Sequence, residues 1–92
     1  MTPLVSARVD DLFAATERDE ATALLERDCG AGVPLVADER TLERIRIACV
    51  KLSGGRLDEL RAAIAQANAD WRDVLVAAGF AHDPLAHERW RP

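Results

Sequence analysis

Four side chains in this sequence could bind a metal ion or attack a substrate: Cys29, Cys49, His82 and His87. Two thiols and two imidazoles form the ligand set of many structural zinc sites, and the spacing of the two histidines suits such a site. The two cysteines do not suit it, because zinc-binding cysteines usually stand only a few residues apart in the chain. We therefore predict no metal site and no cofactor, with both histidines on the surface and His87 placed near Asp83.

A cysteine nucleophile with a histidine base would be one catalytic option, but no local pattern supports it. The sequence contains no Gly-x-Ser-x-Gly turn, no phosphate-binding loop and no dinucleotide-binding glycine pattern. Acidic residues stand in adjacent pairs at 10–11, 19–20 and 58–59. Neighbours on a helix point about 100° apart, so the two carboxylates of such a pair do not converge on one substrate. The sequence predicts a protein that is not an enzyme.

The elements that must position these side chains are predicted to be helices. Strong helix formers dominate the chain, while β-branched and aromatic residues are sparse. Read at helical period, Leu42, Ile45, Cys49 and Leu52 form one stripe, and further apolar residues lie on the other faces of the same segment. A helix that is apolar over most of its girth is buried on several sides. We predict an all-α single domain over residues 1–92, a compact bundle of five or six short helices around a central helix at about 39–52.

The boundaries of the N-terminal helices follow from capping residues. Ser6 is predicted to cap a short helix over residues 7–15. The apolar pattern changes face after Thr16, and Thr16 with Asp19 resembles a capping box, so we favour a break there over one long bent helix. Cys29 is expected at the end of the second helix, as a buried thiol that behaves like a small apolar residue.

The boundaries in the second half are predicted from glycine, proline and aspartate. Residues 30–37 form a loop whose apolar side chains are expected to pack on the bundle or to form a short extended piece. Asp38 should cap the central helix, and Gly54 should end it. A further helix restarts at Asp70, and the last helix is predicted to start at Asp83 and Pro84.

Composition and charge limit the range of functions. The formal net charge is −4, whereas a nucleic-acid-binding domain normally shows a basic face, so nucleic acid is an unfavoured partner. No apolar run approaches the roughly 20 residues that span a bilayer, and the N-terminus lacks the pattern of a signal peptide. We therefore expect a cytoplasmic protein without membrane contact, in which Cys29 and Cys49 stay reduced.

Four residues are candidates for an interface with another protein: Arg46, Arg89, Trp90 and Arg91. Trp90 is expected either to lock the last helix onto the core or to anchor a partner, because tryptophan and arginine are enriched at binding hot spots. Arg46 lies on the apolar side of the central helix and needs a partner there, either Glu43 within the chain or a group on another chain.

The alternative function is DNA binding. Residues 74–90 read as helix, glycine turn and helix, which resembles a helix-turn-helix unit, although basic residues are few there. The segments at 44–55 and 70–80 resemble those of small helical proteins found in bacterial genomes, and this resemblance implies no functional residue. The leading prediction is a non-enzymatic protein–protein interaction module, either an adaptor or a neutralising partner such as an immunity or antitoxin protein. Its partner would be another protein or a second copy of the chain.

Overall fold

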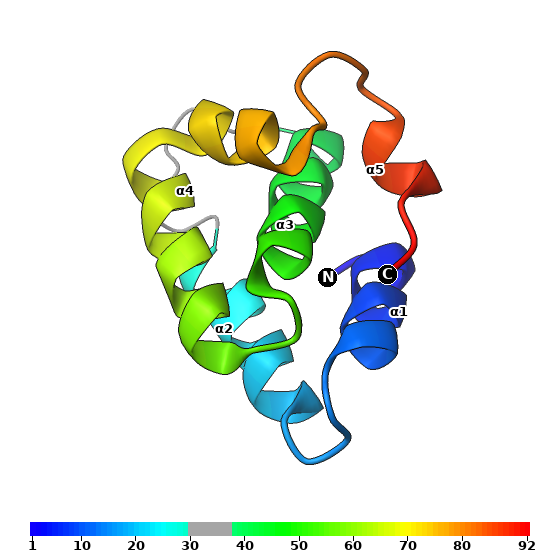
Figure 1. The fold of residues 1–92 in the computed structure, drawn as a ribbon, viewed down its shortest axis with the longest axis vertical. Coiled ribbons are helices and arrows are strands. Elements are labelled where there is room, and N and C mark those ends of the chain that lie inside the picture. The colour runs from blue at the N-terminus through cyan, green and yellow to red at the C-terminus, as the bar shows by residue number, and fades with distance from the viewer. Residues whose placement is uncertain (30–37) are drawn as a thin grey trace.

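The structure is a computed structural model that describes residues 1–29 and 38–92. These residues form five helices, and Figure 1 shows no strand among them. The helices are α1 (Pro3–Leu12), α2 (Arg18–Asp28), α3 (Glu39–Ser53), α4 (Leu57–Ala78) and α5 (Ala86–Arg89). The radius of gyration is 11.5 Å, against about 12 Å expected for a compact domain of this length. The predicted all-α class is confirmed.

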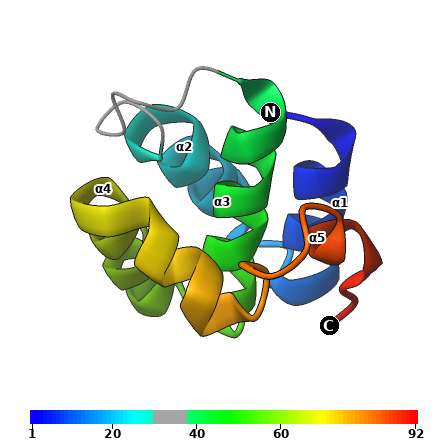
Figure 2. The ribbon, with the colours of Figure 1, turned by 90° about the horizontal axis from the view of Figure 1, so that it is seen from above.

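Helix α3 lies at the centre of the bundle, as predicted. Figures 1 and 2 show it between α1 and α5 on one side and α2 and α4 on the other. Buried α3 residues face in several directions, namely Ile45, Ile47, Ala48, Cys49, Val50 and Ser53. The helix therefore contributes core side chains to each of its neighbours and presents little of its surface to water.

Helix α1 begins earlier than predicted. It starts at Pro3, and the Thr2 hydroxyl accepts a hydrogen bond from the Val5 amide. The prediction of a cap at Ser6 and a helix over residues 7–15 is wrong. Thr2 already caps the helix, and Pro3, which favours the first helical position, follows it directly. Ser6 lies inside the helix.

The break between α1 and α2 is confirmed, but the capping box at Thr16 and Asp19 is wrong. Glu17 is the residue that precedes α2, and no side chain caps this helix end. The turn is instead stabilised by Arg18, the first residue of α2, which reaches back to the end of α1. The Arg18 guanidinium donates to the main-chain carbonyls of Phe13, at 3.1 Å, and Asp10, at 2.9 Å.

Helix α3 has the predicted ends. The Asp38 carboxylate accepts from the Thr41 amide at 2.6 Å. Gly54 ends the helix in the left-handed conformation, with φ of 59°. The prediction for the loop at 30–37 lies outside the described residues.

Helix α4 bends at Asp70, where the sequence predicted a new helix. Asp70 has φ of −157° and ψ of 95°, and its carboxylate accepts from the Arg72 amide at 3.1 Å, as in a helix cap. The two limbs of α4 consequently pack around α3 (Figure 1). Gly79 ends the second limb, and the buried Phe80 donates its amide to the Leu75 carbonyl at 2.8 Å.

Helix α5 is shorter than the sequence suggested. The prediction that this helix starts at Asp83 and Pro84 is wrong: the Asp83 carboxylate accepts from the Leu85 amide at 2.8 Å in a turn, and the helix itself starts at Ala86. Within the described residues, no helix combines the length and the apolar character that a membrane crossing requires.

Basic side chains of α3 bind the carboxyl ends of two other helices. Lys51 donates to the Ala78 carbonyl at 2.7 Å, and Arg44 donates to the Phe80 carbonyl at 2.9 Å, both at the end of α4. Arg46 donates to the Cys29 carbonyl at 3.1 Å, directly after α2. The last carbonyls of a helix lack partners within it and carry partial negative charge, so a cation there is favourable.

We expect Gly55→Ala to destabilise the fold more than Gly54→Ala. Gly55 has φ of 83°, and a Cβ atom at this position would stand 2.5 Å from the Leu12 carbonyl oxygen. A Cβ at Gly54 would meet open space. Gly54→Ala should therefore cost only the left-handed backbone penalty of about 1–2 kcal/mol, whereas Gly55→Ala adds a main-chain clash. Urea denaturation of both variants checks this, and equal free energies of unfolding would contradict it.

Candidate functional site

His87 on α5 is a fully buried ionisable side chain. Its imidazole is inaccessible to solvent, and its Nε2 lies 2.9 Å from Oε1 of Glu43 on α3. The prediction of a surface histidine near Asp83 is wrong, because α5 folds back onto α3 and directs His87 into the core. One signal existed in the sequence. Trp90, three residues later, was a candidate for packing on the core, and this spacing puts His87 on the same helix face.

Glu43 joins three helices through hydrogen bonds. Its carboxylate interacts with His87 of α5 and with the hydroxyl of Thr2, the residue that caps α1. Burial raises the pKa of Glu43, but the hydrogen bonds from Thr2 and His87 outweigh burial and hold the pKa below its ordinary value of 4.5. The carboxylate is thus ionised at neutral pH, and His87 donates to it through Nε2.

Glu43 and His87 are also the centre of the one convergent set of possible metal ligands among the described residues. A carboxylate oxygen of Glu88 lies within 4.8 Å of the other two ligand atoms. A metal bound at Nε2 of His87 would require the imidazole proton at Nδ1, where metal-bound histidines normally donate a hydrogen bond. The buried Nδ1 has no partner. The group therefore fits a structural hydrogen bond better than a metal centre.

The zinc set considered from the sequence is not assembled. His82 is exposed, His87 binds Glu43, and the two cysteines lie together elsewhere. Cys29 and Cys49 are both buried and reduced, as predicted.

The two thiols form a polar pair inside the core, with Arg46 beside them. Cys49 lies beside Cys29, and Arg46, one turn earlier on α3, reaches the same place. The prediction that Arg46 pairs with Glu43 is wrong, since the Glu43 carboxylate binds His87 of α5. The Arg46 guanidinium instead donates to the Cys29 carbonyl, and its buried Nε has no partner.

The remaining interface candidates lie at the C-terminal end. Trp90 is half-buried and packs against the core, and its carbonyl accepts from Arg8 at 3.0 Å. Arg89 forms an ion pair with Asp83, and Arg91 is exposed. Trp90 therefore fixes the end of the chain, with an edge still open to solvent.

The segment at 74–90 forms a helix, a turn and a second helix, but the second helix is one turn long. A recognition helix must project several side chains into the major groove. In α5, His87 is buried and Arg89 is paired with Asp83. Few side chains of α5 are therefore left that could contact DNA bases.

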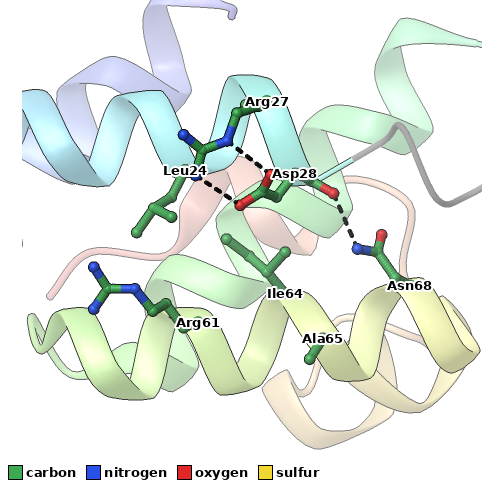
Figure 3. A pocket seen from close by; sticks show the side chains of 7 residues that line it. All are labelled: Leu24, Arg27, Asp28, Arg61, Ile64, Ala65 and Asn68. Carbon is green, nitrogen blue, oxygen red and sulfur yellow. Dashed lines mark hydrogen bonds and ion pairs between the residues drawn. The ribbon is translucent and has the colours of Figure 1, made fainter.

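A cleft of about 350 Å³ opens between α2 and the first limb of α4 (Figure 3). Its apolar lining consists of the buried Leu24 and Ile64 with the exposed Ala65 on the wall. Its rim is polar and consists of Arg27, Asp28, Arg61 and Asn68. The Asn68 side chain closes one end by donating to the Asp28 carbonyl at 3.0 Å. Sequence reasoning missed this cleft, because it depends on how two distant helices lie against each other.

Comparison of the chain with protein-family models, with curated proteins and with solved structures gave no match.

We expect Glu43→Ala to destabilise the protein by about 1–3 kcal/mol, the cost of leaving a buried donor without its acceptor. The donor is Nε2 of His87. Glu43→Gln is the matched control, because its amide oxygen can still accept that hydrogen bond. Chemical denaturation at pH 7 should therefore show a smaller loss of unfolding free energy for Glu43→Gln than for Glu43→Ala. An unchanged unfolding free energy in Glu43→Ala would show that the pair with His87 does not stabilise the fold.

The Glu43 carboxylate should also leave a signature in the pH dependence of stability. Its pKa is lower in the folded protein than the ordinary 4.5, so its contribution is present above that value and lost as the pH falls through the folded pKa. The other carboxyl groups titrate alike in the wild type and in Glu43→Gln. The difference in unfolding free energy between these two proteins should shrink as the pH falls below 4.5. A difference that persists at pH 3 would contradict this assignment.

Proposed function

We propose that this protein is a non-enzymatic protein–protein interaction module, an adaptor or the neutralising partner of another protein. The observation that supports it best is the cleft between α2 and α4, an apolar lining with a charged rim on the outside of the molecule. Exposed apolar surface framed by polar side chains is typical of places where proteins bind each other.

The chemistry of the cleft favours a protein side chain over a small metabolite. Small-molecule sites combine an apolar wall with a few convergent buried polar groups. The charged groups at this rim are solvent-exposed and already paired, Arg27 with Asp28 and Arg61 with Glu20. Exposed ion pairs contribute little stability, so they can exchange partners with the charges of an incoming protein at small cost.

The reactive side chains of the molecule are engaged internally, which also supports this proposal. His87, Cys29 and Cys49 are fully buried, and Arg46 binds a main-chain carbonyl. In this arrangement these functional groups do not reach the surface, so a protein partner would contact other side chains.

Charge indicates the kind of partner. The net charge of −4 favours a basic protein, because opposite charges speed association and orient the encounter. An apolar side chain flanked by lysine or arginine would fit the cleft, with the cations near Asp28 and Glu20. Arg91 and the open edge of Trp90 provide a second contact region. We propose no DNA-binding function, since no feature of α5 favours it.

The test is affinity capture with paired variants of the tagged protein in lysate of the source organism. Ala65→Arg fills the cleft from its exposed wall, and Ala62→Arg places the same side chain on the same helix outside the cleft lining. We expect a stoichiometric partner with the wild type and with Ala62→Arg, and at least about a tenfold weaker retention with Ala65→Arg, equivalent to 1.4 kcal/mol.

Two results would overturn the proposal at different levels. Equal capture by both variants would exclude the cleft as the contact. No stoichiometric partner, together with a monomeric wild type in solution, would exclude the interaction function itself.

A further inference from the structure

Two buried thiols, Cys29 and Cys49, lie beside the arginine Arg46. Core packing alone does not require a thiol pair next to a positive charge. Cys29 follows α2, and Cys49 lies in α3, about one helical turn after Arg46. Both cysteine side chains are fully buried, and Arg46 donates to the Cys29 carbonyl at 3.1 Å, so the same face of α3 brings Cys49 beside Cys29. Nothing in the sequence spacing would place them side by side.

The charge of Arg46 is the second observation. Its guanidinium donates one hydrogen bond to the neutral Cys29 carbonyl, while the buried Nε has no partner. In the described ranges no carboxylate forms an ion pair with it, because Glu43 is taken by His87. Arg46 is half-buried, and its buried Nε is a donor left without an acceptor, which is costly. A thiolate at Cys29 would supply both the missing negative charge and an acceptor.

Three contacts act in the same direction on the ionisation of Cys29. The hydrogen bond from the Cys49 thiol lowers the pKa of Cys29, burial opposes this, and the charge and hydrogen bond of Arg46 lower the pKa further. The same shared proton, together with burial, raises the pKa of Cys49. Arg46 lies next to Cys29, so Cys29 is the thiol of the pair whose thiolate a positive charge stabilises.

We propose that Cys29 and Cys49 form a reversible dithiol–disulfide pair in which Cys29 attacks as a thiolate with Arg46 as its counter-ion. The oxidant is a hydroperoxide, with hydrogen peroxide as the probe, since only a water-sized oxidant suits thiols that are inaccessible in the resting structure. The proposal is independent of the interaction function.

The reaction balances in two steps. The Cys29 thiolate attacks one peroxide oxygen, the O–O bond breaks, and the released hydroxide takes a proton to become water, which leaves a sulfenic acid on Cys29. The sulfur of Cys49 then attacks the sulfur of Cys29, the S–O bond breaks, and the second water leaves with the proton of the Cys49 thiol. Two thiols lose two electrons in total, and one peroxide molecule is reduced to two waters. A low-molecular-weight thiol reverses the change.

Intact-mass analysis gives the first test. The reduced full chain is treated with hydrogen peroxide, unfolded and alkylated with N-ethylmaleimide. We expect a monomer that has lost about two mass units and takes up no label, because two S–H hydrogens are removed when a disulfide forms. Trypsin should then release residues 28–40 joined to residues 47–51, the two peptides that hold the cysteines. Two labelled thiols after treatment, or a disulfide between two chains, would overturn the proposal.

A pair of arginine variants tests the role of the counter-ion. Arg44 is the matched control for Arg46, since it lies on the same helix, binds one main-chain carbonyl and also has a buried Nε without a partner. We expect Arg46→Gln to slow the peroxide reaction at neutral pH about tenfold, the loss of thiolate for one pKa unit, while Arg44→Gln leaves the rate unchanged. Equal rates in both variants would exclude Arg46 as the counter-ion.

A pH profile of the wild type keeps the proposal testable if Arg46→Gln does not fold. The rate of peroxide oxidation should reach half its maximum below the ordinary thiol pKa of about 8.5. A half-maximum at or above that value would overturn the assignment of Cys29 as the ionised group. In Cys49→Ser the reaction should stop at the sulfenic acid, which dimedone captures when the oxidised protein is unfolded in its presence. The absence of an adduct under these conditions would show that Cys29 does not attack.

Discussion

The bundle depends on the polar side chains of its central helix, which bind every other helix of the described structure. Glu43 holds the start of α1 through Thr2 and holds α5 through His87. Arg46 binds the end of α2, and Arg44 and Lys51 bind the end of α4. Apolar packing brings helices together without specifying how far each one slides, whereas a hydrogen bond to one particular carbonyl does. The contacts of these four side chains therefore fix the register of the helices around α3.

This arrangement explains why a helix with so many buried apolar residues can also carry several charges. An arginine or lysine on a buried face is costly unless its donors meet acceptors. The carboxyl end of a helix offers such acceptors, since its last carbonyls have no partners within the helix. Arg8 and Arg18 repeat the same contact at Trp90 and Phe13. Many of the basic residues that are frequent in this acidic chain thus serve as internal ligands for main-chain carbonyls.

The features that the sequence predicted correctly are those set by local chemistry. Asp38 and Gly54 bound the central helix because capping and left-handed residues act within one turn. The bend at Asp70 was visible for the same reason. The apolar residues on several faces of 42–52 predicted the burial of the middle of this helix, and Ile45, Ile47, Ala48, Cys49 and Val50 are buried. The prediction is wrong for Leu52, the last residue of the stripe, which is exposed near the end of the helix.

The features that the sequence did not predict depend on contacts between distant segments. His87 lies in a helix too short to show a period, and its partner Glu43 is far away in the chain. The sequence placed Cys29 and Cys49 separately in the core, but only the packing of α2 on α3 shows that they touch. The cleft requires the relative placement of α2 and α4. The interaction function and the interface residues stay predictions, since they concern a molecule other than this one.

The close approach of Gly55 to Leu12 has a consequence for protein engineering. Short surface turns are the usual places to insert a peptide tag or a second domain, because they tolerate extra length. The turn between α3 and α4 is exposed in part, yet its main chain touches the end of α1 with no room for one additional carbon. An inserted segment would push α1 away from the bundle. A fusion protein that must keep this fold should place its insertion in the exposed turn at residues 14–16 instead.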